Sequence, residues 1–385
     1  MRKRLLILIP NLRGSGCERI VAAMLPALAR RYSVRLVTYD AQCRYDLPAD
    51  IDWQVIDSPN VAVSSLWGKG VRMQSRVRAI AQSMRVFSPD LVLTFIDTCN
   101  IVGWAAHRLS GLSCPLVVAE HTVGPEFFDK NVHASRHERL LKSMLALVYR
   151  RVSRLIAVSH AMVRYMASDL HIDRHVDVIH NGFDVNSYFP PADLDQGRGH
   201  SAEWPRILSV GALSENKNQQ LLISAFPLIK QHFPQAVLTL VGEGELCETL
   251  KAQAQASPFG DDIMFAGWSD QVAAHYRASD LLVHASQYES FGNVIAEGFM
   301  CGLPAVCTPA TDAYNEVFFA SYCGEILDSW RVEGMADGVV RVLTQISSKP
   351  DLRRQLATEA AKRFSLEQMI ANYEAVLEGA LSCAQ

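Results

Sequence analysis

An apolar run, a glycine-containing turn and a segment of helical periodicity follow one another within residues 281–306, and this order limits the fold more than any other feature of the sequence. The run LLVHAS is typical of a buried strand, and apolar residues recur at helical spacing from Val294 to Cys301. Gly302 and Pro304 predict the end of that helix. In a parallel α/β sheet, such a junction lies at the edge where ligands bind. Because the N-terminus of a helix favours an anion, the sequence predicts a phosphate site there.

Strand-like and helical segments alternate along nearly the whole chain, which predicts an α/β fold with parallel sheets. The alternation stops in a Gly-, Pro- and Asp-rich stretch over 186–204 and then resumes. A length of 385 residues also favours two domains. We therefore expect a first domain over 1–185, a linker over 186–204 and a second domain over 205–364, with residues 365–385 forming a last amphipathic helix.

Composition excludes several classes of protein. The chain is 49% hydrophobic and 20% charged, which suits a globular protein with a large core. No run of 18 apolar residues occurs, and the start MRKRLLILIP is better explained as a first strand than as a signal peptide. The nine cysteines form no C-x-x-C pair, so we expect reduced thiols in a cytoplasmic protein and no metal site.

Charge differs between the two halves. Residues 1–185 carry 24 Lys and Arg against 16 Asp and Glu, whereas residues 186–385 carry 13 against 24. Basic amphipathic helices are expected over 71–87 and 136–154, and they predict contact with an anionic surface, such as the inner face of a membrane, or an ordinary solvated face. Nucleic acid is not an expected partner, because basic residues do not interleave with aromatic ones.

Two carboxylates flank the predicted phosphate site, Glu289 before the turn and Glu297 inside the helix, with seven residues between them. This stretch resembles the nucleotide-sugar site of retaining GT-B glycosyltransferases (glycosyltransferase family 4, "glycosyl transferases group 1"), whose pattern is S-x-x-E-x-F-G-x-x-x-x-E-A-M-A-C-G-x-P-V-V. The residues that match are Ser286, Glu289, Phe291, Gly292, Glu297, Cys301, Gly302, Pro304 and Val306. Further segments similar to the family in the same order are VIHNGFD at 178–184, VGALSENK at 210–217, LVGEG at 240–244 and FAG at 265–267.

The resemblance implies two Rossmann-like domains with parallel sheets facing a central cleft, and a final helix that crosses back to the first domain. It implies transfer of a sugar from a nucleotide-sugar, with a UDP-sugar expected ahead of a GDP-sugar, to a glycan or a lipid-linked acceptor in polysaccharide or lipopolysaccharide biosynthesis. The nucleotide-sugar is a co-substrate, so no cofactor and no metal ion are expected. Peripheral attachment to the inner face of the cytoplasmic membrane would fit such an acceptor.

The resemblance also implies roles for single residues. Lys217 is the cation for the diphosphate, Glu297 accepts from the ribose hydroxyls, and Glu289 and His121 lie close to the donor sugar. Donor-binding backbone is implied at Gly16, Gly211, Ala266, Gly267, Phe291, Gly292, Asn293 and Val294. The turn after the first strand places Arg13, Gly14 and Arg19 on the acceptor side.

Two departures from the family pattern leave alternatives open. Ala212 stands where the family usually has an arginine, for which Arg13 or Arg19 could substitute, and the loop before Glu316 lacks the usual glycine pair. A non-catalytic sugar-nucleotide-binding relative is therefore one alternative. An NAD(P)-dependent oxidoreductase is the other, because Gly14-x-Gly16 and Asp40 resemble a dinucleotide fingerprint whose third glycine is replaced by Arg19.

Overall fold

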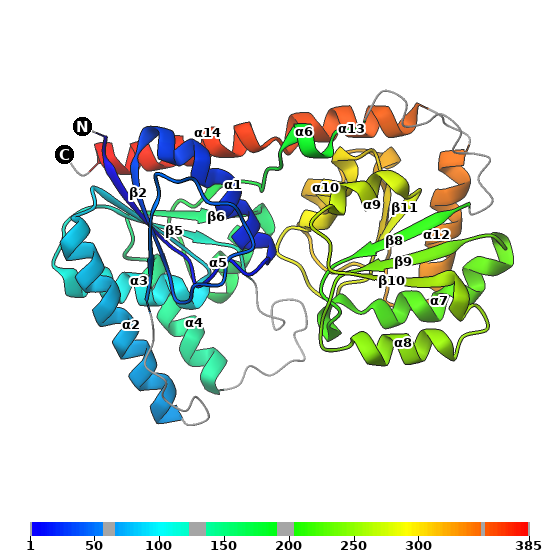
Figure 1. The fold of residues 1–385 in the computed structure, drawn as a ribbon, viewed down its shortest axis with the longest axis horizontal. Coiled ribbons are helices and arrows are strands. Elements are labelled where there is room, and N and C mark those ends of the chain that lie inside the picture. The colour runs from blue at the N-terminus through cyan, green and yellow to red at the C-terminus, as the bar shows by residue number, and fades with distance from the viewer. Residues whose placement is uncertain (1, 57–65, 123–135, 191–203, 348–350, 384–385) are drawn as a thin grey trace. The chain divides into compact units, whose positions relative to one another are not determined.

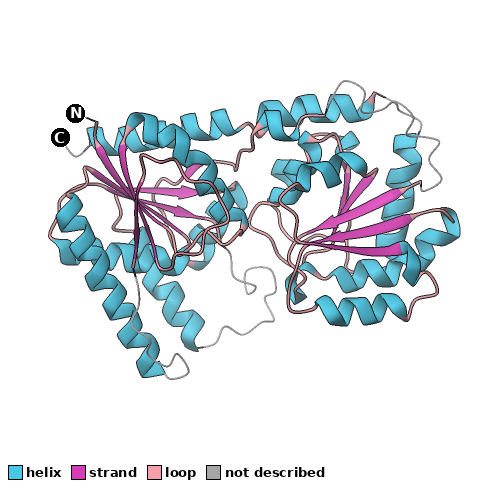
Figure 2. Ribbon diagram, viewed as in Figure 1, coloured by secondary structure: helices cyan, strands magenta, loops and turns pink. Residues whose placement is uncertain are grey.

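The structure is a computed structural model, which describes residues 2–56, 66–122, 136–190, 204–347 and 351–383. The chain divides into two compact units: unit 1 comprises Met1–Gly182 with Leu366–Gln385, and unit 2 comprises Phe183–Ser365. Helices and strands alternate in both units (Figures 1 and 2). Each is therefore an α/β unit built on its own sheet.

Unit 1 is built on a parallel sheet whose described strands run in the order β3-β2-β1-β4-β5-β6-β7. The strands are β1 (Arg4–Leu8), β2 (Ser33–Thr38), β3 (Asp52–Val55), β4 (Leu91–Phe95), β5 (Leu116–Glu120), β6 (Arg154–Ala157) and β7 (Asp177–Val178). All five residues of β4 and of β5 are buried, as expected of central strands covered by helices on both faces. The order reverses beside β1, so the unit is doubly wound and the Rossmann-like topology implied by the resemblance is confirmed here.

Helices cover both faces of this sheet (Figure 1). They are α1 (Gly16–Arg31), α2 (Leu66–Phe87), α3 (Asp97–Ser110), α4 (Arg136–Tyr149), α5 (His160–Asp169) and α14 (Leu366–Ser382). α1 packs against α14, and α3 packs against both α2 and α4. The last helix of the chain thus belongs to unit 1, where Arg31 of α1 forms ion pairs with Glu374 and Glu378.

Two predicted helix boundaries are wrong. The helix expected over 71–87 begins five positions earlier, at Leu66. The helix expected over 136–154 ends at Tyr149, and Arg154 instead begins β6. Arg154 is held in that strand by two hydrogen bonds to Asp177 of β7, at 2.9 and 2.7 Å. Its tertiary partner therefore overrides the helical periodicity of the sequence.

Unit 2 repeats the architecture with a second parallel sheet, ordered β10-β9-β8-β11-β12-β13 in the described residues. Its strands are β8 (Arg206–Val210), β9 (Val237–Val241), β10 (Ile263–Gly267), β11 (Leu281–His284), β12 (Ala305–Cys307) and β13 (Gly324–Ile326). Its helices are α6 (Val185–Tyr188), α7 (Gln219–His232), α8 (Cys247–Gln255), α9 (Val272–Ala278), α10 (Asn293–Met300), α11 (Tyr314–Val317), α12 (Val332–Ser347) and α13 (Leu352–Arg363). α7 packs against α8 and α12, and α10 packs against α9 and α13. Apolar side chains of α7 and α12 close the core over β8, β9 and β11.

Candidate active site

The predicted strand, glycine turn and helix are present in unit 2 as β11, residues 285–292 and α10. Gly292 caps α10 with φ 98°, a left-handed conformation that favours glycine. A Cβ at this position would lie 2.9 Å from Cε1 of Tyr314, so the ring also excludes a larger residue. The first turn of a helix leaves N–H groups without partners in the helix, and these groups suit an anion.

Glu289 lies in this turn at the centre of a cluster of hydrogen-bond donors. Lys217 forms an ion pair with its Oε1, and Nε2 of His284 lies 2.9 Å from the same oxygen. The hydroxyl of Ser286 donates to it at 3.0 Å. Burial alone would raise the pKa of Glu289, but the charge of Lys217 and the hydrogen bonds from His284 and Lys217 outweigh it and hold that pKa well below its usual range. The carboxylate is therefore fixed in its charged form.

Lys217 reaches Glu289 because two loops are tied together. It ends a short 3₁₀ helix, η3 (Glu215–Lys217), which follows β8. The neighbouring Asn216 donates to the carbonyl of Tyr288 at 3.2 Å and accepts from the Tyr288 N–H at 3.1 Å. At Gly211 a Cβ would lie 3.7 Å from Cγ of Lys217, so the lysine stem passes close to that backbone. Asn216 was not predicted from the sequence, although its short polar side chain beside Lys217 is a signal for a loop contact of this kind.

Glu297 lies in a different environment. Its side chain is fully buried within unit 2, and its Oε2 accepts a hydrogen bond from the hydroxyl of Tyr276 at 3.1 Å. A ribose would reach it only after movement of the side chains that cover it. The role implied for Glu297 therefore stays a prediction.

The end of β10 carries Ala266 and Gly267, whose backbone the resemblance assigns to donor binding. The ladder with β9 shifts register between Phe265 and Gly267 and so skips Ala266. Ala266 is exposed and Gly267 has φ 70°. A bulge of this kind frees backbone groups at a strand end, as recognition of a base by backbone atoms requires.

Unit 1 holds the remaining predicted residues around β1 and β5. Gly14 has φ 120°, Gly16 begins α1, and the Glu18 carboxylate accepts from the N–H groups of Gly14 and Ser15 at 2.7 and 3.0 Å. Arg13 donates to Asp40 at 2.7 Å. The guanidinium considered as a replacement cation and the carboxylate of the dinucleotide-like pattern are thus partners of each other. Arg19 lies half-buried on the first turn of α1.

His121 directly follows β5, as predicted, and its Nε2 lies 3.3 Å from the hydroxyl of Tyr373 on α14. Burial lowers the pKa of His121 to about 4, so the ring is neutral at physiological pH. The preceding residue, Glu120, is buried and accepts from the backbone N–H groups of His121 and Thr122 at 2.9 and 2.7 Å. Glu120 was missed in the sequence, where a carboxylate ending an apolar strand gave no distinctive pattern.

Glu120 has an unusual ionisation. Burial, together with the charge of Asp97, raises its pKa to about 8, although hydrogen bonds from Tyr149 and from the backbone act in the opposite direction. The turn that carries His121 is therefore built on a carboxyl group that is largely protonated at neutral pH.

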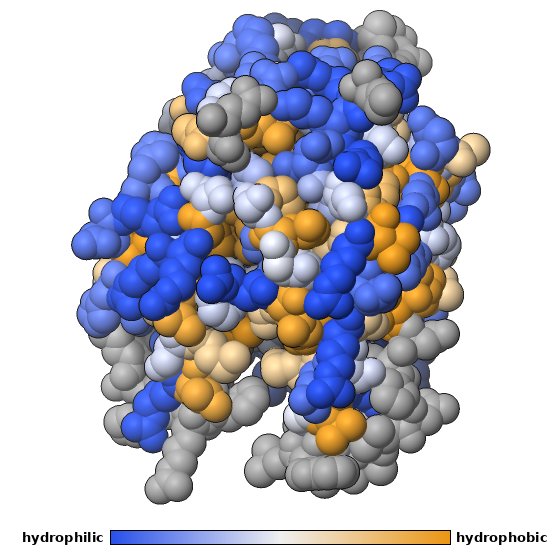
Figure 3. Space-filling view, turned by 90° about the vertical axis from the view of Figure 1, so that its left-hand side faces the viewer, coloured by the Kyte–Doolittle hydropathy of each residue, from blue (hydrophilic) through white to orange (hydrophobic). Residues whose placement is uncertain are grey.

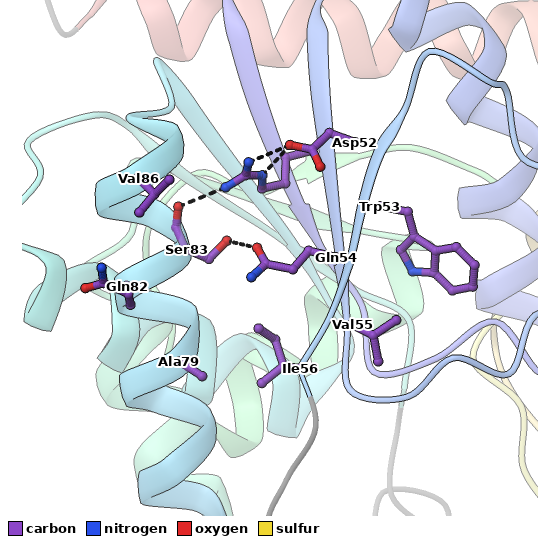
Figure 4. A pocket seen from close by; sticks show the side chains of 10 residues that line it. Asp52, Trp53, Gln54, Val55, Ile56, Ala79, Gln82, Ser83 and Val86 are labelled. Carbon is purple, nitrogen blue, oxygen red and sulfur yellow. Dashed lines mark hydrogen bonds and ion pairs between the residues drawn. The ribbon is translucent and has the colours of Figure 1, made fainter.

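A hollow of about 590 Å³ lies elsewhere in unit 1, between β3 and α2 (Figure 4). Its polar side chains bond to one another: Arg35 donates to Asp52 and to the Ser83 carbonyl, and the Ser83 hydroxyl donates to Gln54. The side chain of Trp53 points away from α2 in this view. The hollow contains none of the predicted site residues, and we assign it no ligand.

The described residues lack both a metal-binding cluster and a membrane-spanning helix. No group of three or more His, Cys, Asp or Glu side chains there could hold a metal ion. No helix in the same part of the chain has the length and apolar character needed to cross a membrane.

Comparisons with known proteins identify the family and the fold. Residues 14–187 match the family model "Glycosyltransferase Family 4", and residues 193–363 match "Glycosyl transferases group 1". A similar protein is the N-acetylgalactosamine-N,N'-diacetylbacillosaminyl-diphospho-undecaprenol 4-alpha-N-acetylgalactosaminyltransferase of Campylobacter jejuni, which is 22% identical over 93% of this chain and 95% of that protein.

Similar solved structures show the fold. Sucrose-phosphate synthase from Thermosynechococcus elongatus superposes with a TM-score of 0.85 at 17% identity, covering 99% of this chain and 100% of that one. HepE of Anabaena in complex with UDP and glucose superposes with a TM-score of 0.78 at 19% identity, covering 98% and 100%. The two parallel α/β units have the GT-B fold, and the chain belongs to the group 1 glycosyltransferases.

Proposed function

We propose that this glycosyltransferase moves a sugar from a UDP-sugar to a lipid-linked or glycan acceptor, with retention of anomeric configuration and without a metal ion. The observation that carries the proposal is the placement of Lys217 and Glu289 beside the Gly292-capped N-terminus of α10. A leaving diphosphate needs fixed positive charge, which a lysine and a helix N-terminus supply. A developing oxocarbenium ion needs a nearby anion, and Glu289 is held ionised.

In the proposed reaction the bond between the anomeric carbon and the β-phosphate oxygen breaks, and the acceptor oxygen bonds to that carbon on the same face. The acceptor proton passes to the leaving phosphate. Lys217 and the N–H groups of α10 stabilise the departing diphosphate. Neutral His121 contributes a hydrogen bond to the donor sugar and does not act as a strong base, in keeping with its lowered pKa.

The substrates are proposed from the relatives. The C. jejuni protein acts on a diphospho-undecaprenol-linked sugar according to its name, and the HepE structure contains UDP and glucose. These names favour a UDP-sugar and a lipid-linked acceptor of polysaccharide or lipopolysaccharide biosynthesis. The protein would then work on the cytoplasmic side of the membrane that presents the acceptor.

The test begins with binding and then measures transfer. Melting temperature is measured with UDP, GDP, NAD and a panel of nucleotide-sugars, because a ligand of the folded state raises it. Radiolabelled donors are then incubated with lipid extract, with and without a metal chelator, and the anomer of the product is determined by NMR. We expect a shift with UDP, transfer that resists the chelator, and a retained anomer.

Two other outcomes of the binding and transfer measurements would favour a different function. Stabilisation by NAD alone would favour the oxidoreductase, and binding of a donor without transfer to any acceptor would favour a non-catalytic relative. The matched variant Lys217→Met keeps the length of the stem and removes the charge. A UDP affinity equal to wild type in this variant would contradict the role of the lysine.

We also propose that unit 1 contacts an anionic membrane surface through α2 and α4. Exposed apolar side chains on these helices are Met73, Val86, Leu140 and Leu147, and exposed basic residues include Arg78 and Arg139. Figure 3 shows one side of unit 1, where hydrophilic side chains predominate and hydrophobic patches lie between them. Such mixed surfaces suit the membrane interface.

Several of the basic side chains are used inside unit 1 instead. Arg76 lies over the ring of Tyr39 at 4.0 Å, Arg85 donates to the Leu109 carbonyl at 2.6 Å, and Arg150 donates to the Leu170 carbonyl at 3.0 Å. The proposal therefore depends on the exposed pair Arg78 and Arg139. Replacing both with Gln should weaken co-sedimentation with anionic liposomes at low salt. Arg341→Gln in unit 2 is the control. Liposome binding that depends on neither lipid charge nor salt would refute the proposed membrane contact of α2 and α4.

A further inference from the structure

The proposed function leaves His284 without a role, although its imidazole lies in the candidate site. His284 is the last residue of β11 and is 2% exposed. Its backbone carbonyl accepts from the N–H of Thr308 at 3.1 Å, and the ring of Tyr314 packs edge-on at 6.4 Å between centroids. The backbone of His284 is therefore fixed in the sheet, and its imidazole is packed on one side by Tyr314.

The hydrogen-bond geometry fixes which nitrogen carries the proton. Nε2 lies 2.9 Å from Oε1 of Glu289 and 3.0 Å from the hydroxyl of Ser286, which itself donates to Oε1. A carboxylate only accepts, so Nε2 must donate. Burial lowers the pKa of His284 despite the neighbouring Glu289, which favours a neutral ring with its hydrogen on Nε2.

The three donors around Glu289 share one oxygen. Within the part of the chain that the structure describes, the hydrogen bonds to Glu289 from Lys217, His284 and Ser286 all end on Oε1. This arrangement fixes the carboxylate by one oxygen and leaves Oε2 for a ligand. Lys217 differs from the other two donors, because a bound diphosphate would compete with Glu289 for its ammonium group.

We propose that His284 is a positioning residue, which together with Ser286 holds Glu289 by Oε1 so that Oε2 meets the donor sugar while Lys217 turns to the diphosphate. The inference rests on the proposed function and assigns separate roles to the residues that contact Glu289. Lys217 serves the leaving group, and the uncharged pair His284 and Ser286 serves the carboxylate. Without His284, Ser286 would be the one described donor left to Glu289 once a bound diphosphate draws Lys217 away.

Two variants of similar size separate this role from simple packing. His284→Gln keeps an N–H donor near the position of Nε2. His284→Leu fills a similar space with an apolar side chain that donates no hydrogen bond. We expect the Leu variant to lose about tenfold or more in kcat, the size of effect that a misplaced catalytic group produces. We expect its UDP affinity to stay within about threefold of wild type, and the Gln variant to recover most of kcat.

The kcat values of the Gln and Leu variants are compared, and a double-mutant cycle with Glu289→Gln is measured. Equal losses in the Gln and Leu variants would show that His284 only packs, and an unchanged kcat in the Leu variant would remove the role altogether. In a Glu289→Gln background, adding His284→Leu should cost little more, because the two residues act as one unit. Independent, multiplicative losses would overturn the proposal.

A spectroscopic measurement keeps the inference testable without turnover and without a foldable Leu variant. Nitrogen-15 NMR of the histidine rings in the whole protein should show His284 neutral at pH 7 with its proton on Nε2, and Glu289→Gln should shift that resonance. A proton on Nδ1 would refute the inference even in an active enzyme. The expected tautomer in a protein that transfers no sugar would instead count against the proposed function alone.

Discussion

The imidazole Nε2 of His121 lies 3.3 Å from the hydroxyl of Tyr373, which stands 252 residues further along the chain. The ring of Phe95 packs against both, at 5.7 Å from His121 and 6.2 Å from Tyr373. The last helix of the chain therefore supplies part of the environment of a residue at the end of β5. Both lie in unit 1, so this contact ties the C-terminal helix to the predicted site.

This contact predicts the effect of Tyr373→Phe. Loss of one partly buried hydrogen bond should lower the free energy of unfolding by about 1 kcal/mol and leave the fold intact. We expect a fall of a few-fold in turnover, smaller than that of His121→Ala, as measured by initial rates with a saturating donor. Equal activity in all three proteins would exclude His121 from the reaction.

The lowered pKa of His121 predicts a pH dependence. The folded ring titrates near pH 4, whereas an unfolded histidine titrates near 6.5. As pH falls from about 6.5 to 4, the unfolded chain binds a proton that the folded chain refuses, so His121 makes the fold less stable over this range. NMR should find its ring resonances constant above about pH 5, and a midpoint near 6.5 would contradict the buried environment.

Glu120 affects the pH dependence of stability in the opposite direction to His121. Its pKa is raised from 4.5 to about 8, so between these values the unfolded chain has lost a proton that the folded chain keeps. Stability from this group is therefore complete below about pH 4.5 and is lost as pH rises through 8. Glu120→Gln mimics the protonated acid, and urea unfolding should show its advantage over wild type growing from pH 5 to pH 8. A constant difference would mean that Glu120 is ionised in the folded state.

The two glutamates of the motif should give different kinetic phenotypes. Glu289→Ala removes the charge held beside the helix N-terminus and should mainly lower kcat, whereas Glu297→Ala should mainly weaken donor binding. Because Glu297 is buried and bonded to Tyr276, its variant is also expected to melt at a lower temperature. Unchanged kinetics in both variants would show that the motif has been placed wrongly.

Gly292→Ala should be strongly destabilising. A non-glycine residue in the left-handed region costs about 1–2 kcal/mol, and here the new Cβ would also meet Cε1 of Tyr314 at 2.9 Å. Gly111→Ala is a matched control, because Gly111 has φ 75° but nothing within 4 Å of the added Cβ. Urea unfolding should show the larger loss for Gly292→Ala. Equal losses would mean that the Tyr314 contact contributes nothing.

Tyr314→Phe should make the protein more stable. The Tyr314 hydroxyl is buried and has no hydrogen-bond partner among the described residues, and an unpaired buried hydroxyl costs about 1–3 kcal/mol. The same change at Tyr276, whose hydroxyl donates to Glu297, should be destabilising. Thermal unfolding of the two variants compares the signs directly. A loss of stability in Tyr314→Phe would show that the hydroxyl has a partner.

Some sequence expectations failed for a physical reason that single residues make clear. Arg154 lies in a stretch of helical periodicity, yet it belongs to β6 because Asp177 holds it there. His284 and Glu120 end apolar strands, where a single polar residue looks like a tolerated irregularity. Their importance appears only when Glu289 and the N–H groups of His121 and Thr122 are brought beside them.

The sequence by itself determined the order of strands and helices, the glycine at the start of α10 and the family, because periodicity, turn residues and motif spacing are local properties of the chain. Only the tertiary structure decided which side chains share an oxygen of Glu289, because Lys217 lies 72 positions away and reaches it through a loop contact made by Asn216. The same holds for the burial of Glu297 and the neutral ring of His121. Ionisation and contact depend on what folds around a residue, and spacing along the chain does not encode that.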